Sequence, residues 1–155
     1  MLFRSTTMTS DDSETQYQGH SDCLRVASLE RTHPLMKGLS ELVLNRSGWL
    51  ALQPSEGMSW EVLATVPETC SPRRSRGQPL IAASLSGSPE AGTMIVAADP
   101  SLFTNSMLWH GDNALFAIRV SEWLCRGEKR RLAFLVDGWP LPSYRASPQI
   151  GRAHV

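Results

Sequence analysis

The amino-acid sequence predicts an α/β fold, a mixed and mainly parallel sheet with flanking helices. Short apolar runs typical of strands follow one another between residues 41 and 98. A helical pattern at 113–126 then separates two nearly continuous apolar runs, 93–98 and 132–136, of the kind that a sheet buries on both faces. Strand, helix and strand in this order predict a βαβ unit with parallel strands and a right-handed crossover.

Shorter strands are expected ahead of this unit. Residues 41–44 and 49–52 are apolar and flank a turn-like stretch, 45–48, which ends in glycine, a spacing typical of a β-hairpin. Two more apolar runs follow at 60–66 and 79–85. A loop rich in serine, glycine and proline then leads into the βαβ unit.

The segment 113–126 has the pattern of an amphipathic helix. Its apolar stripe consists of Phe116, Ala117, Val120, Trp123 and Leu124, while charged residues mark the opposite side. Gly127 stands where the C-cap of a helix belongs. The pattern therefore predicts a helix that packs on the sheet with one side.

The domain boundaries follow from composition. Residues 1–32 are rich in polar residues without a sustained period, which predicts a disordered or poorly ordered tail. Residues 33–138 form the predicted α/β domain. Residues 139–155 contain prolines at 140, 142 and 148, so they cannot continue a helix or a central strand and are expected to form a proline-rich tail.

Charge and hydropathy argue against several classes of protein. The 155 residues include 15 Lys and Arg and 15 Asp and Glu, so the formal net charge is zero. Nonspecific binding of nucleic acid depends on phosphate neutralisation by basic side chains, and we therefore expect no nucleic-acid partner. No run approaches the ~18 apolar residues of a membrane span, so direct membrane insertion is not expected.

The cysteines and the N-terminus predict a cytoplasmic protein. Cys23, Cys70 and Cys125 are odd in number and widely spaced, which excludes a fully paired disulfide framework and a C-x-x-C motif. Such cysteines fit a reducing compartment. The first residues also lack the apolar core of a signal peptide.

A polar cluster follows the apolar run 93–98. It consists of Asp99, Ser101, Asn105, Asp112 and Asn113. One interpretation is structural: Asp99 or Ser101 can cap the turn that follows, and Asp112 can cap the helix. The other is functional, because ligands of open α/β sheets gather beyond the carboxyl ends of the strands. The cluster could then bind a polar small molecule or a cation, and the sequence leaves both interpretations open.

Motifs that would indicate an enzyme are missing from the sequence. None of the three cysteines stands on the small-residue turn that a cysteine nucleophile of an α/β enzyme needs. The G-x-S-x-G motif and the glycine-rich phosphate loops do not occur. The pair His110 and Asp112 alone is a poor metal signal. We therefore predict no catalytic residue, no cofactor and no metal.

Two of the five tryptophans are candidate partner contacts. Trp109 and Trp139 fall in predicted loops, whereas Trp49, Trp60 and Trp123 fall in predicted core positions. Tryptophan in a loop combines a large apolar surface with a polar N–H group, which suits it to anchor a partner.

Three segments resemble a known bacterial family. They are HPLMKGL at 33–39, GTMIVAADPSLFTN at 92–105 and GDNA at 111–114, the last followed by a helix that ends in Trp-Leu. The family has no known function, a class I glutamine-amidotransferase-like (flavodoxin-like) fold, and a relation to gliding-motility auxiliary proteins of ABC transporters. The resemblance covers about residues 33–138 and implies a domain that is incomplete at its N-terminus. Relatives are often membrane-associated.

The sequence as a whole predicts a non-catalytic binding or assembly module. An incomplete sheet would leave apolar surface and strand edges uncovered, so we expect a protein partner or self-association. The alternative is a small-molecule-binding or metal-binding enzyme or sensor that uses the polar cluster at the carboxyl edge of strand 93–98.

Overall fold

A computed structural model of the chain describes residues 2–4, 6–53, 58–86, 94–125, 135–136 and 139–140. The chain divides into two compact units, Met1–Leu124 and Cys125–Val155. The first unit contains β1 (Leu2–Arg4), β2 (Thr9–Ser10), β3 (Gln16–Tyr17), β4 (His20–Val26), β5 (Leu42–Asn45), β6 (Trp49–Ala51), β7 (Met58–Thr65), β8 (Cys70–Ser71), η1 (Arg73–Ser75), β9 (Pro79–Ser86), β10 (Ile95–Ala97), η2 (Pro100–Phe103) and α1 (Asn113–Leu124). The second contains β11 (Leu135–Val136) and β12 (Trp139–Pro140).

Every strand pairing among the described residues is antiparallel. The predicted α/β fold with a mainly parallel sheet is therefore wrong, and so is the glutamine-amidotransferase-like architecture that the resemblance implies. The predicted βαβ unit is not formed, because β10 pairs with β9, and β11 pairs with β12. The described fold is mainly antiparallel β with one α-helix.

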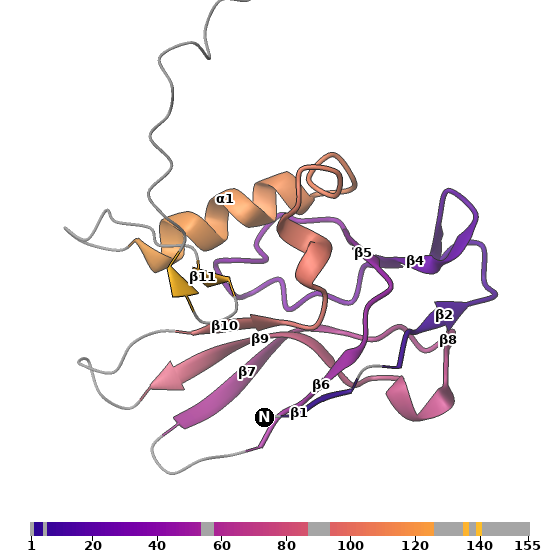
Figure 1. Cartoon of the computed structure of the whole chain (residues 1–155), viewed down its shortest axis with the longest axis horizontal. Coiled ribbons are helices and arrows are strands. Elements are labelled where there is room, and N and C mark those ends of the chain that lie inside the picture. Colours follow the sequence, from indigo (N-terminus) through magenta and orange to yellow (C-terminus); the bar gives the residue numbers. More distant parts are fainter. Residues whose placement is uncertain are drawn as a thin grey trace, which may run out of the picture. The chain divides into compact units, whose positions relative to one another are not determined.

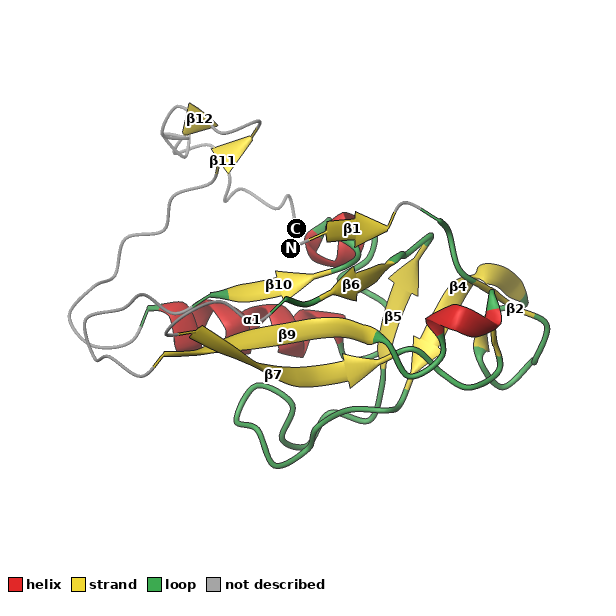
Figure 2. Cartoon of the chain, turned by 90° about the horizontal axis from the view of Figure 1, so that it is seen from below, coloured by secondary structure: helices red, strands yellow, loops and turns green. Residues whose placement is uncertain are grey.

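The largest pairing surface is a three-stranded sheet in the order β10-β9-β7 (Figures 1 and 2). Ala82 of the central strand lies opposite Val62 of β7 and Val96 of β10. Residues 80–84 of β9 are buried, as their apolar run predicts. The strands run antiparallel because the link from β9 to β10 is too short for a parallel crossover, which needs about a dozen residues or more.

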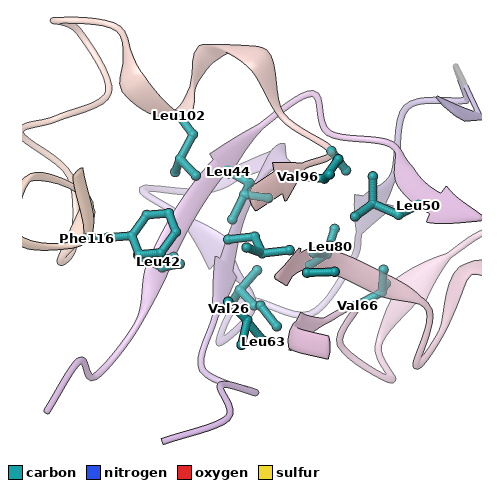
Figure 3. Packing of buried hydrophobic residues seen from close by; sticks show 14 of the residues in the cluster. Val26, Leu42, Leu44, Leu50, Leu63, Val66, Leu80, Val96, Leu102 and Phe116 are labelled. Atoms are coloured by element: carbon teal, nitrogen blue, oxygen red, sulfur yellow. The ribbon is translucent and has the colours of Figure 1, made fainter. Parts of the chain in front are cut away.

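The helix covers one face of this sheet (Figures 1 and 2). The predicted stripe is confirmed in part, since Phe116 and Val120 are buried and Trp123 packs against the core as a half-buried side chain. Leu124, at the end of the predicted stripe, is instead exposed. Figure 3 shows Phe116 pointing into the same cluster as Leu42 and Leu80. No helix in the described part of the chain is long and apolar enough to cross a membrane.

The segment predicted as a tail, 1–32, instead supplies β1 to β4. Met8, Leu24 and Val26 are fully buried in the core. The polar residues that suggested disorder form turns, such as the one in which the carboxylate of Asp12 accepts hydrogen bonds from the amide of Glu14 and the hydroxyl of Thr15. β1, β2 and β3 are too short to show a period in the sequence, and β4 has seven residues but begins with three polar ones.

The hairpin predicted over residues 41–52 does not form, although both of its strands exist. β5 pairs with β4 in the sheet β3-β4-β5, whereas β6 pairs with β1. The turn residue in left-handed conformation is Arg46, with φ 51°, and not the glycine that the hairpin would need. After β5 the chain therefore does not fold back on β5, and β6 pairs with β1 instead.

In the second unit, β11 and β12 form a two-stranded antiparallel pair with Val136 opposite Trp139. Of the predicted strand 132–136, only Leu135–Val136 is described. The side chain of Trp139 and residues 141–155 of the predicted proline-rich tail lie outside the described part of the chain.

Candidate functional site

Asp99, the first residue of the polar cluster, is buried and joins two segments of the chain. Its Oδ1 accepts hydrogen bonds from the amide and the hydroxyl of Ser101, each at 2.7 Å. Asp99 thereby caps η2, as the structural interpretation predicts. Its Oδ2 accepts a hydrogen bond from the backbone amide of Asn45 at 2.7 Å. Both carboxylate oxygens are thus engaged within the protein.

Asp112 binds the chain segment that leads into β5. Its Oδ2 accepts hydrogen bonds from the amides of Ser40, at 2.6 Å, and Glu41, at 3.2 Å. Its own amide donates to the carbonyl of Glu41 at 3.1 Å. The side chain therefore does not cap α1 as the sequence predicts; only the backbone carbonyl of Asp112 receives the first helical hydrogen bond, from Phe116.

Asn113 is fully buried and pairs with β5 as a neighbouring strand would. Its Oδ1 accepts from the amide of Val43 at 3.0 Å, and its Nδ2 donates to the carbonyl of Val43 at 2.8 Å. The second Nδ2 hydrogen is donated to the carbonyl of Met107 at 2.9 Å. The carboxamide thus replaces the two hydrogen bonds that a partner strand makes to one residue.

Asp99, Asp112 and Asn113 together close one edge of β5, and we call them the edge cluster. They accept from the amides of Glu41, Val43 and Asn45, alternate positions whose N–H groups point to the same side of a strand. The opposite side of β5 pairs with β4. An unpaired strand edge leaves polar backbone groups without hydrogen-bond partners, which costs free energy where the edge is buried. The hydrogen bonds to the edge cluster remove this cost.

The remaining two members of the predicted cluster lie apart from this edge. Ser101 is half-buried and its hydroxyl donates to Asp99. Asn105 is exposed and, in the described part of the chain, its side chain makes no hydrogen bond. It lines an apolar hollow of about 410 Å³ together with Leu108, Trp109 and Ala114.

Trp109 is the most exposed large apolar side chain of the described residues, with 87% of its surface accessible. The outer side of α1 continues the apolar surface beyond the hollow. Leu115 is 39% exposed and Ile118 is 56% exposed, and Ile118 lies one helical turn from both Ala114 and Leu115. We call Leu108, Trp109, Ala114, Leu115 and Ile118 the Trp109 surface. Trp109 was expected from the sequence, whereas the helix residues were missed although their spacing could have indicated them.

Two of the described thiols, those of Cys23 and Cys70, are poorly suited to act as nucleophiles. Burial raises the pKa of Cys23, and the carboxylates of Asp22 and Asp99 raise it further. Burial raises the pKa of Cys70 to about 11, against a smaller lowering by Arg76. A high thiol pKa keeps the sulfur protonated at neutral pH, and the thiolate is the reactive form.

A metal site is not formed by the described residues, since no group of three or more His, Cys, Asp or Glu side chains is arranged to hold an ion. No protein-family model, curated protein or solved structure matches the chain.

Proposed function

We propose that this protein is a non-catalytic assembly module and that two copies pair through the Trp109 surface. The exposure of Trp109 carries the proposal. Tryptophan is enriched among the few residues that supply most of the binding energy of an interface, and exposed apolar surface of this kind marks interaction sites.

The charge distribution favours a second copy as the occupant. The Trp109 surface carries no charged residue, and the guanidinium of the nearby Arg119 donates a hydrogen bond to the backbone carbonyl of Lys37. A formal net charge of zero removes long-range repulsion between two copies. In a two-fold dimer the same surface faces itself, so an uncharged apolar surface is complementary to its own copy.

The non-catalytic part of the proposal rests on the edge cluster and the thiols. Asp99, Asp112 and Asn113 use their polar atoms on the backbone around β5, which leaves little for a ligand. The alternative, an enzyme or sensor that binds its ligand at this cluster, has less support for that reason. The raised pKa of Cys23 and of Cys70 argues against a cysteine nucleophile.

We also propose a cytoplasmic location. All three cysteines are free thiols, which suits a reducing compartment. The resemblance in the sequence remains a prediction that the chain is related to that bacterial family. The prediction no longer includes the family's fold.

Sedimentation of the full chain over a hundredfold range of concentration tests the assembly. We expect a reversible rise from the 17.1 kDa monomer toward twice that mass. Trp109→Ala should weaken the association by about thirtyfold or more, because truncation of an interface hot spot costs ~2 kcal/mol or more.

Met94→Ala is the matched control, since Met94 is a large apolar side chain, 47% exposed, outside the Trp109 surface. It should associate as the parent does. A parent chain that stays monomeric up to ~1 mM, where even contacts worth ~4 kcal/mol would register, contradicts the proposal. So does an association that Trp109→Ala leaves unchanged.

A further inference from the structure

A second hollow, separate from the Trp109 surface, has polar walls. Its volume is about 330 Å³, and its walls come from the β3–β4 turn, the start of β4, the end of β5 and the loop before α1. We call it the polar pocket; Tyr17, Asp22, Asn45, Arg46 and His110 are the lining residues that matter most for its chemistry. Its volume lies near the lower limit of ligand sites, which run from about 300 to 1,000 Å³.

Two residues of this pocket have a backbone conformation that their side chains disfavour. Gln18 has φ 53° and Arg46 has φ 51°, and among the described residues no other non-glycine residue has positive φ. Both line the polar pocket. The two-residue turn between β3 and β4 accounts for the positive φ of Gln18. Strain such as that at Arg46 persists where the surrounding structure or a function requires it.

One wall of the pocket is ordered by an aromatic pair. The rings of Tyr17 and His110 meet edge to face with centroids 5.0 Å apart, and the Tyr17 hydroxyl lies 3.3 Å from His110 Nδ1. Other polar groups of the walls are free: the Asn45 carboxamide and the His20 imidazole make no hydrogen bond within the described part of the chain. The pocket thus has donors and acceptors available for a ligand.

The charges of the pocket consist of one anion and one cation at its rim. The Nε of Arg46 lies 3.0 Å from Oδ2 of Asp22, and their side chains are 74% and 35% exposed. This pair uses one of the several donors of the guanidinium, and water reaches both partners. Burial and then the carboxylates of Asp22 and Asp99 raise the pKa of Cys23, another residue that lines the pocket.

We infer that the polar pocket binds a small zwitterion, a free amino acid, whose ammonium group binds Asp22 and whose carboxylate binds Arg46. A zwitterion offers an ammonium donor to the Asp22 carboxylate and a carboxylate acceptor to the unused donors of the Arg46 guanidinium, whereas a singly charged ligand offers only one of the two. The free carboxamide of Asn45 and the imidazole of His20 can hydrogen-bond the ligand's polar groups. This binding is independent of pairing through the Trp109 surface.

Isothermal titration calorimetry of the full chain with each of the twenty standard amino acids tests this assignment. We expect at least one of them to bind. Its N-acetyl and its carboxamide derivatives, which each lack one charge, should bind about tenfold or more weakly, as expected for the loss of a charge-assisted hydrogen bond.

Arg46→Gly separates binding from folding. Glycine accepts a φ of 51° without strain, so the variant should unfold at the same temperature as the parent or higher, yet lose amino-acid binding. Arg25→Gln is the matched control, because Arg25 of β4 also forms an ion pair, with Glu41 at 2.7 Å, and lies outside the polar pocket. It should bind as the parent does.

The inference is overturned if none of the twenty amino acids binds, or if the derivatives bind as well as the parent compound. Unchanged binding by a folded Arg46→Gly variant would also overturn it, because the site would then lie elsewhere.

Discussion

Asn113 shows how one side chain replaces a strand. Its carboxamide makes three hydrogen bonds, two to Val43 and one to Met107, in a position with no accessible surface. A buried backbone group that loses its partner costs more than the bond itself contributes, because no water replaces it. Asn113 is therefore as important to β5 as a neighbouring strand would be.

Asn113→Ala should lower the free energy of unfolding by about 3 to 5 kcal/mol, since it leaves three buried backbone groups without partners. Urea unfolding measures the effect. Asn105→Ala is the matched control: Asn105 is exposed, so its truncation should change the stability by less than ~0.5 kcal/mol. Equal effects of the two substitutions would contradict the role given to Asn113.

Gly111 allows the loop before α1 to lie close to β5, because it has no side chain. Its φ is +50°, and a Cβ there would lie 3.0 Å from Cγ2 of Val43 and 3.3 Å from the carbonyl oxygen of Glu41. Gly38 has φ +73° and nothing within 4 Å of such a Cβ. The two glycines share the left-handed conformation but differ in their surroundings.

Gly111→Ala should therefore destabilise by about 3 kcal/mol, from left-handed strain and steric overlap together. Gly38→Ala carries the strain alone and should cost about 1 kcal/mol. Thermal unfolding of both variants gives the difference, which isolates the contact with β5. A Gly111→Ala variant no worse than Gly38→Ala would mean that the loop moves away from β5 at little cost.

At the scale of elements, β5 is held differently on its two edges. One edge pairs with β4 by backbone hydrogen bonds. On the other edge, backbone amides of β5 and of the segment before it donate hydrogen bonds to the side chains of the edge cluster. The edge cluster lies in the segment from β10 to the start of α1, so it also attaches that segment to the sheet. An edge closed by side chains cannot serve as a template for another strand.

Asp112→Ala distinguishes an anchor of β5 from a helix cap. The substitution should cost about 1 to 2 kcal/mol and speed amide hydrogen exchange at Ser40 and Glu41, whose partner is removed. Asp11→Ala, a truncation of an exposed carboxylate, is the control and should change neither quantity. Faster exchange confined to the first turn of α1 would instead support the capping prediction.

At the scale of the whole molecule, the hydrophobic core of the described residues lies within the unit Met1–Leu124. It includes Met8, Leu24 and Val26 from the segment predicted to be a tail. Fully burying a side chain of this size contributes about 1.5 to 3 kcal/mol. Three of them amount to a large part of the 5 to 15 kcal/mol that stabilises a typical domain.

Two deletions test this organisation. A chain that ends at Cys125 keeps every core residue named above and should unfold cooperatively within a few degrees of the full chain. A chain that lacks residues 1–26 loses β4 and the three core side chains, and it should show no cooperative transition. Circular dichroism against temperature measures both. A cooperative transition in the chain that lacks residues 1–26 would support the prediction that residues 1–32 form a poorly ordered tail.

Several elements could be predicted because their signals are local. The helix at 113–124 and the strands near 42–45, 60–65 and 79–86 follow from the apolar period and from the breakers that flank them. Trp109 was identified as a surface residue because it stands in a polar turn. Of the strands before residue 27, β1, β2 and β3 have only two or three residues, too few to show a period, and β4 was missed because its seven residues are mostly polar.

By itself, the sequence determined most of the strands and turns between residues 41 and 98 and where the one described α-helix begins, but not the strands before residue 27. Only the tertiary structure decided which strands pair, in which direction, and what the polar cluster does. The physical reason is distance along the chain: Asp112, Asn113 and Asp99 find their partners in β5 and its lead across 72, 70 and 54 residues. A local pattern shows that a carboxylate or an amide needs a partner, but the partner itself is provided by the packing of remote segments. That packing uses Asp99, Asp112 and Asn113, which the sequence left open as caps or as ligand-binding residues, to close the edge of a strand.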